Sequence, residues 1–150
     1  MEGSGDFEKV EAGRLVKGSL VMIGGKPRKV VHVSKAKPGK HGSAKAIITA
    51  VGLLDDKKVE RSYGTSDLLD APIVKRIEYA LLGFEDDFLI LQSDSGHTRE
   101  DLKLSEQASM KEVNDLIKKN YDEDVPSIVT IMSVCGQEIP VAVKEDTLDI

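Results

Sequence analysis

The sequence predicts a mainly β (all-β) protein made of two small barrels, and three observations support this fold class. Short runs rich in Val and Ile recur along the chain, separated by turn-forming Gly, Pro, Asp and Ser residues. Trp is absent and aromatic residues make up only 4% of the chain, so the cores must consist mainly of Val, Ile and Leu. Residues 1–72 hold 13 Lys and Arg against 9 Asp and Glu, whereas residues 73–150 hold 8 against 17. We therefore expect domains at 13–72 and 73–150, after a flexible polar tail at 1–12.

The first domain is expected to contain closely spaced strands. These are the β-branched runs at 20–23, 28–34, 46–54 and 58–63. Gly24-Gly25 joins the first two runs and Asp55-Asp56 joins the last two, and both pairs are typical of turns. Strands this short and this close together, without a helical period, are typical of a small barrel. Residues 64–72 are expected to connect the two domains, with Pro72 stiffening the crossing.

The second domain is expected to combine strands with one helix. Its strands are the runs at 77–82, 88–92, 97–104, 127–134 and 138–144. Ser109 and Glu112 have the spacing of a capping box, so we expect the helix to begin there. Val113, Leu116 and Ile117 then share one helical face. Five strands with a helix between the third and the fourth fit an OB-like barrel.

A cationic loop is expected between the second and third strands of the first domain. The run Lys35–Lys45 carries four lysines and no acidic residue, and Pro38-Gly39 and Gly42 interrupt it. Proline and glycine disfavour regular helix there, so we expect an exposed tight loop with Lys40 near its tip. The wider stretch 26–45 contains seven basic residues and no acid. Such a concentrated positive charge attracts phosphate even though the whole chain has a net charge of −5.

A family resemblance begins at this loop. The segment Lys37-Pro38-Gly39-Lys40-His41-Gly42-Ser43-Ala44-Lys45 resembles the lysine-modification loop of the eukaryotic and archaeal translation initiation factor 5A family. That loop has the core Lys-x-Gly-Lys-His-Gly-x-Ala-Lys, which the segment matches throughout. The resemblance extends over roughly residues 13 to 145, including Ala71-Pro72, Asp94-Ser95-Gly96 and Arg99-Glu100-Asp101-Leu102. It implies an SH3-like barrel carrying the loop at 13–72, followed by an OB-fold at 73–150.

The resemblance also implies a function for Lys40. In the family this lysine becomes hypusine, through the addition of a hydroxylated aminobutyl group derived from spermidine. The residues implied to meet RNA on the ribosome are Lys37, Gly39, Lys40, His41, Gly42, Ser43 and Lys45. For His41 two uses stay open, either hydrogen bonding and stacking on RNA or bracing the loop.

The implied function is that of a ribosome-binding translation factor. It would place modified Lys40 near peptidyl-tRNA, promote peptide-bond formation at stalling sequences such as consecutive prolines, and assist termination. The implied partners are the ribosome, peptidyl-tRNA, deoxyhypusine synthase and deoxyhypusine hydroxylase.

The residues themselves predict no catalytic site, cofactor or metal. His32 and His97 have no metal-ligand spacing to another His or Cys, and no P-loop or nucleophile-elbow motif is present. Cys135 lies in an apolar run, as expected for a small core residue. No run approaches the roughly 20 apolar residues that cross a bilayer, and the N-terminus lacks a signal-peptide pattern. We therefore expect a cytoplasmic protein that is not an enzyme and has no membrane partner.

Two other classes of function fit parts of the sequence. A structural self-assembling protein of the Woronin-body core type shares the two-barrel fold, but it need not keep the modifiable lysine, so the intact motif around Lys40 disfavours it. A general single-stranded RNA-binding module would act through the OB-like half. Such modules present aromatic residues and a basic groove, whereas residues 73–150 have a charge balance of −9 and few aromatic residues.

Overall fold

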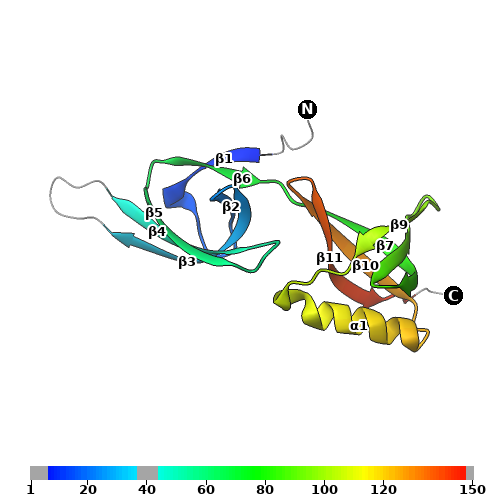
Figure 1. Cartoon of the computed structure of the whole chain (residues 1–150). Helices are drawn as coiled ribbons and strands as arrows, with labels where there is room; N and C mark the ends of the chain where they lie inside the picture. Colours follow the sequence, from blue (N-terminus) through cyan, green and yellow to red (C-terminus); the bar gives the residue numbers. More distant parts are fainter. Residues whose placement is uncertain (1–6, 37–43, 148–150) are drawn as a thin grey trace. The chain divides into compact units, whose positions relative to one another are not determined.

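The computed structural model describes residues 7–36 and 44–147. The chain folds into two compact units, Met1–Ile73 and Val74–Ile150, and each unit has a hydrophobic core of its own. Strands dominate both units (Figure 1), so the predicted mainly β fold class is confirmed.

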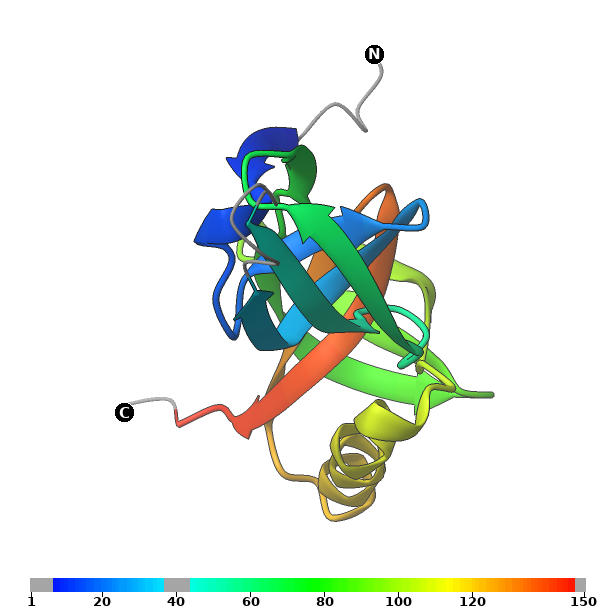
Figure 2. The same cartoon turned by 90° about the vertical axis from the view of Figure 1, so that its left-hand side faces the viewer.

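The first unit is a curved four-stranded sheet with a two-stranded ribbon. The sheet has the order β2-β3-β4-β5, and every neighbouring pair is antiparallel. Its strands are β2 (Leu20–Ile23), β3 (Lys26–Ala36), β4 (Lys45–Gly52) and β5 (Lys58–Gly64). Figure 2 shows these strands curling around one inner face, in the manner of the SH3-like barrel that was expected.

Strand β4 forms the centre of the first core. Ala46, Ile48 and Ala50 are fully buried and alternate along the strand, because successive side chains of a strand point to opposite faces. They pack with Val30 of the adjacent strand β3 and with Val21 of β2. Every second side chain of β4 is therefore held in the core, which fixes the orientation of the strand that follows the cationic loop segment.

The structure differs from the sequence prediction at the expected tail 1–12 and at the expected connection 64–72. Phe7–Glu11 forms strand β1, which pairs antiparallel with β6 (Leu68–Pro72). Val10 and Leu69 face each other in this ribbon, and both pack against the core of the first unit. Each segment offers few buried apolar residues, so only the pairing of the two, distant in sequence, makes them strands.

The second unit is a five-stranded antiparallel sheet with the order β11-β10-β7-β8-β9. Its strands are β7 (Lys75–Glu85), β8 (Phe88–Gln92), β9 (Thr98–Lys103), β10 (Ser127–Val134) and β11 (Gln137–Glu145). The helix α1 (Lys111–Asp122) lies between the third and fourth of these strands, as the OB-like prediction required. The core of the second unit consists mainly of Leu, Ile and Val side chains.

Helix α1 differs in detail from its prediction. Ile117 is buried and Val113 packs on the core, but Leu116 is 41% exposed, so the apolar face is narrower than expected. The predicted capping box is wrong, because the N-cap residue is Met110 and no side chain caps the helix. A 3-10 turn, η3 (Ala108–Met110), leads into the helix instead. Within the described ranges, no helix is long and apolar enough to span a membrane.

The turn between β10 and β11 corrects the prediction for Cys135. Cys135 and Gly136 form a two-residue turn with φ angles of 51° and 77°, and they are flanked by the facing pair Val134 and Gln137. Two positive φ angles are typical of a type I′ hairpin turn. Cys135 is therefore a half-buried turn residue rather than a core residue, and burial raises the pKa of its thiol.

Candidate functional site

The β3–β4 hairpin carries the predicted functional loop. Lys35 faces Ala46, and Ala36 faces Lys45, in the last pairs of the ladder before the loop segment. Lys45 is exposed at the first position of β4. The other predicted site residues lie outside the described residues: Lys37, Gly39, Lys40, His41, Gly42 and Ser43. The structure therefore defines the stem that carries these residues.

A chain of backbone hydrogen bonds anchors the C-terminal end of the loop segment. The carbonyl oxygen of Ala44 accepts a hydrogen bond from the amide of Thr65, at 3.1 Å. The carbonyl oxygen of Thr65 in turn accepts one from the amide of Gly13, at 2.8 Å, in the 3-10 turn η2 (Ala12–Arg14). A Cβ atom on Gly13 would lie 2.9 Å from both the Cβ and the carbonyl oxygen of Thr65. Glycine is thus required for the close approach that ties this end of the hairpin to the barrel.

A short turn holds Thr65 in place. The amide of Gly64 donates a hydrogen bond to the Oδ2 atom of Asp67, at 2.8 Å. The amide of Asp67 bonds the carbonyl of Gly64 at 3.0 Å, which closes the same turn. The roles of Gly13, Thr65 and Asp67 at the loop base were not predicted from the sequence. The signal was present in Gly64-Thr65-Ser66-Asp67, since Asp side chains commonly bond backbone amides in turns.

The cationic surface is smaller than the sequence indicated. Arg28, one of the seven basic residues between 26 and 45, is buried with 6% exposure. Its Nε donates to the carbonyl of Ile23 at 3.0 Å, and one of its terminal nitrogens donates to the carbonyl of Lys57 at 2.9 Å. Arg28 therefore holds two turns together and is not available to an external phosphate.

Lys26 is paired with an acidic residue. Its Nζ lies 3.2 Å from the Oδ2 atom of Asp55. The pKa of Asp55 is lowered mainly by a hydrogen bond from the backbone amide of Lys57, with further help from Lys26, so the carboxylate stays ionised.

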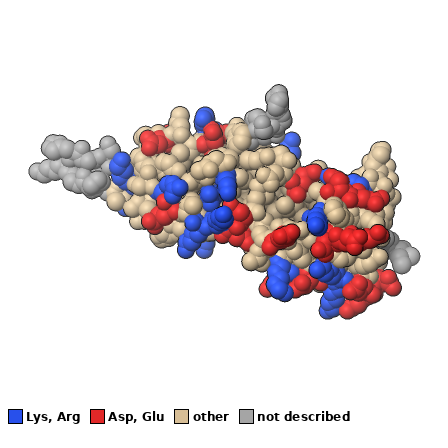
Figure 3. Space-filling model, viewed as in Figure 1, with Lys and Arg blue, Asp and Glu red and all other residues tan. Residues whose placement is uncertain are grey.

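Three exposed lysines remain on the described part of the β3–β4 hairpin, namely Lys29, Lys35 and Lys45. None of them forms an ion pair with another described residue. Figure 3 shows Lys and Arg side chains gathered on the visible face of the first unit. Of the basic residues between 26 and 45, these three exposed lysines lie along the hairpin, and Lys35 and Lys45 stand at its loop end.

His32 and His97, the two described histidines, lie in different units. His32 is exposed on β3, and His97 lies beside the turn that precedes β9. The Oγ atom of Ser95 is 2.9 Å from Nδ1 of His97, but both residues are exposed, and the amide of His97 is bonded to the Oγ atom of Ser93. These contacts organise a turn. Among the residues that the structure describes, no group of His, Cys, Asp or Glu side chains could hold a metal ion.

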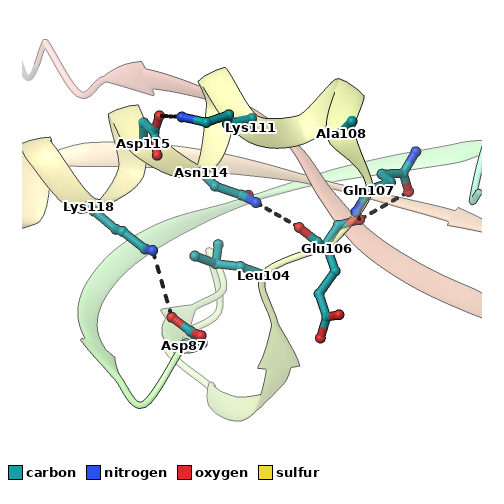
Figure 4. A pocket seen from close by; sticks show the side chains of 10 residues that line it. Asp87, Leu104, Glu106, Gln107, Ala108, Lys111, Asn114, Asp115 and Lys118 are labelled. Carbon is teal, nitrogen blue, oxygen red and sulfur yellow. Dashed lines mark hydrogen bonds and ion pairs between the residues drawn. The ribbon is translucent and has the colours of Figure 1, made fainter. Parts of the chain in front are cut away.

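A cavity of about 360 Å³ lies beside helix α1 in the second unit. Figure 4 shows Lys118 reaching toward Asp87 across it, with the two charged atoms 3.9 Å apart. Lys111 is paired with Asp115 at 2.8 Å along the helix. Asn114 donates a hydrogen bond to the carbonyl of Ser105 at 2.7 Å. The charged groups on the helix side of this cavity bond one another, so they leave little charge for a ligand.

Comparison with known proteins gives matches over both units. Residues 6–67 match the family model described as "Translation initiation factor 5A-like, N-terminal". Residues 73–144 match the model described as "Eukaryotic elongation factor 5A hypusine, DNA-binding OB fold".

Individual relatives agree with these models. The chain is 38% identical to eukaryotic translation initiation factor 5A-3 of Arabidopsis thaliana, over 90% of this chain and 84% of that protein. It is 35% identical to eukaryotic translation initiation factor 5A-1 of Saccharomyces cerevisiae, over 95% and 88%. A solved structure of a translation initiation factor eif-5a family protein from Naegleria fowleri has a TM-score of 0.83 and 36% identity, covering 93% of this chain and 99% of its own. The chain therefore belongs to the translation initiation factor 5A family.

Proposed function

We propose that this protein is a ribosome-binding translation factor whose Lys40 carries hypusine. It would place that side chain near peptidyl-tRNA, promote peptide-bond formation at stalling sequences such as consecutive prolines, and assist termination. The observation that carries the proposal is the unbroken motif Lys37–Lys45 in a chain that belongs to the translation initiation factor 5A family. The ribosome would supply the chemistry, and the factor would supply positioning and electrostatic support.

The geometry of the stem supports this role. β4 is held in the core through Ala46 and Ile48, and Ala44 is bonded to Thr65, so the segment that ends at Ser43 is attached to a rigid base. A functional group is positioned best when its support is rigid. The exposed Lys35 and Lys45 add positive charge at that base, which suits contact with a phosphate backbone.

The proposed partners follow from the proposed modification of Lys40 and from the proposed action on the ribosome. Deoxyhypusine synthase would transfer the aminobutyl group of spermidine to Lys40, and deoxyhypusine hydroxylase would complete the modification. The protein would be a substrate of these enzymes and not an enzyme itself, and it would act with the ribosome and peptidyl-tRNA in the cytoplasm. His41, Gly39, Gly42, Lys37 and Ser43 would shape the loop around Lys40 or contact RNA.

Peptide mass mapping of protein from its native cell tests the modification. We expect the mass of hypusine on Lys40 in native protein and unmodified lysine in protein made in a host that lacks the pathway. An unmodified Lys40 in cells with an active pathway would overturn this part of the proposal.

A substitution at Lys40 tests the function. Lys40→Arg keeps the charge but cannot accept the aminobutyl group, so output of a polyproline reporter should fall to the level without the factor. The free energy of unfolding should change by no more than about 0.5 kcal/mol. Normal reporter output with folded Lys40→Arg would show that positive charge alone suffices.

A further inference from the structure

A second cavity lies on the β7–β8 hairpin, away from the β3–β4 stem in sequence. It has a volume of about 310 Å³ and is lined by Glu85, Asp86, Phe88, Ile90 and Glu100. Asp86 and Asp87 form the hairpin turn, with φ angles of 53° and 66°, and Glu85 faces Phe88 across it. Two positive φ angles are typical of a tight type I′ turn, so this edge of the cavity is a compact hairpin end.

The floor of the cavity is apolar. Leu89 and Leu91 are fully buried in the core, so Phe88 and Ile90, which alternate with them, stand on the opposite face of β8. Phe88 is 40% exposed. Gly83 faces Ile90, and a Cβ atom at Gly83 would lie 2.9 Å from Cδ1 of Ile90. The glycine therefore leaves room for the Ile90 side chain to spread across β7.

The rim of the cavity is acidic, and Lys103 is a cation close to its floor. None of Glu85, Asp86 and Glu100 forms an ion pair with another described residue. The nearby cation Arg99 is already engaged by Asp101 at 2.8 Å and by Glu138 at 2.8 Å. The Nζ atom of Lys103 lies 5.5 Å from the centroid of the Phe88 ring, an arrangement in which an aromatic face attracts an ammonium group.

This cavity lies on the part of the second unit that corresponds to the oligonucleotide-binding face of an OB-fold. OB-folds bind oligonucleotides on the face of their second and third strands and on the loop between the first and second. The corresponding elements here are β8, β9 and the Asp86-Asp87 turn. β8 supplies the apolar floor of the cavity, and the acidic rim comes from Glu85 at the end of β7, Asp86 in the turn and Glu100 on β9. Figure 3 shows Asp and Glu side chains over much of the visible face of the second unit. A phosphate backbone would be repelled from such a surface.

We propose that this cavity docks a basic segment of a partner protein. An arginine or lysine of that segment would lay its aliphatic stem on Phe88 and Ile90, and its charged head would meet Glu85, Asp86 and Glu100. Charge complementarity favours this occupant, because an apolar floor inside an acidic rim matches a long side chain with a cationic end. The proposal concerns the second unit alone and does not depend on the modification of Lys40.

Titration of the full chain with a fluorescein-labelled peptide of repeating Gly-Arg-Leu units tests this proposal. Glu85→Gln combined with Glu100→Gln should weaken binding at least tenfold, because it removes two rim charges. Glu112→Gln combined with Glu123→Gln is the matched control, since both residues are exposed elsewhere in the same unit, at either end of α1. This control should weaken binding less than twofold. In NMR spectra of the protein, addition of the peptide should shift the backbone amide resonances of β8 and β9.

Two outcomes would overturn the proposal. Equal weakening by the two double variants would show that the peptide responds only to net charge. Tighter binding of a single-stranded oligouridine than of the peptide, with the same β8 and β9 amides shifted, would show that the cavity belongs to a nucleic-acid surface. Phe88→Ala provides an independent check. It should weaken both the Gly-Arg-Leu peptide and a Gly-Arg-Gly peptide, because the arginine stem that the two peptides share loses the ring on which it lies, and binding unchanged by Phe88→Ala would contradict the proposed placement of that stem.

Discussion

Arg99 on β9 donates two hydrogen bonds to Glu138 on β11, at 2.8 and 3.1 Å, and so joins the two edge strands of the second sheet. One of the same guanidinium nitrogens also lies 3.2 Å from the hydroxyl of Tyr79 on β7. Asp101 binds the other edge of the guanidinium through two contacts of 2.8 Å. The first and last strands of the sheet order are not neighbours in its ladder, so this cluster closes the barrel where backbone pairing does not.

Arg99→Gln should therefore loosen the second unit. The side chains of Arg99 and Glu138 are only 23% and 32% exposed, so their charge-assisted bonds are partly shielded from water. We expect the free energy of unfolding to fall by about 1–3 kcal/mol. Hydrogen exchange measured by mass spectrometry should then become roughly tenfold to a hundredfold faster in β9 and β11, with β3 and β4 of the same molecule as the internal reference.

Lys111→Gln is the control for this prediction. It removes an ion pair with Asp115 that is exposed on helix α1, and such pairs contribute little. Its exchange rates should stay close to those of the parent. If Arg99→Gln left the exchange rates of β9 and β11 unchanged, the cluster around Arg99 would not be what closes the barrel.

Acid should weaken the same cluster. The hydrogen bonds from Arg99 lower the pKa of Asp101, and partial desolvation opposes this only in part. A carboxyl whose pKa is lowered on folding contributes stability above its unfolded pKa of about 3.9, and that contribution is lost as the pH falls through the folded value. Urea unfolding of the second unit between pH 6 and pH 2 should thus show a smaller acid loss in Asp101→Asn than in the parent. If the free energy of unfolding fell equally with pH in both proteins, Asp101 would not contribute to the loss of stability in acid.

The strands that were predicted well from the sequence are those with an alternating or a continuous pattern of apolar side chains. The runs 20–23, 88–92 and 127–134 coincide with β2, β8 and β10, because β-branched and leucine side chains fill both cores. β1 and β6 were missed because each has few buried residues and depends on a partner 57 to 65 positions away.

Only some features of the candidate site could be predicted from the sequence. Its place between two strands and the exposure of Lys45 follow from local sequence, and the structure bears out both. The burial of Arg28 and the bond between Ala44 and Thr65 depend on backbone carbonyls brought together by folding, which no local pattern encodes. The role of Lys40 itself stays a prediction.

Gly13→Ala should disturb the base of the loop from a distance. The added methyl group would lie 2.9 Å from Thr65, so the chain must shift, and overpacking of this kind destabilises by about 1–3 kcal/mol. The shift should weaken the bond between Thr65 and Ala44, and amides of β4 next to the loop should exchange faster. Ser66→Ala, an exposed change in the same turn, should have no such effect. Unchanged exchange at Lys45 in Gly13→Ala would show that the loop base does not rely on this contact.

Lys35 and Lys45 should provide phosphate contacts on the ribosome. Both are exposed at the loop end of the β3–β4 hairpin, and neither is paired with another described residue. Each phosphate contact releases counterions, so the logarithm of affinity falls with the logarithm of salt concentration by nearly one unit per contact. Replacing both lysines with Gln should therefore lower this slope by about two. The measurement is ribosome binding at several salt concentrations.

A matched double variant separates this local effect from a change in net charge. Lys118→Gln with Lys119→Gln also removes two positive charges, but from helix α1 in the acidic second unit, where Lys118 already faces Asp87. Its slope should stay close to that of the parent, and circular dichroism should show both double variants folded. Parallel slopes for the parent and the Lys35 and Lys45 variant would mean that the hairpin does not meet phosphate. The positive charge of the first unit would then have to act elsewhere, through residues such as Lys58 on β5, which is also exposed.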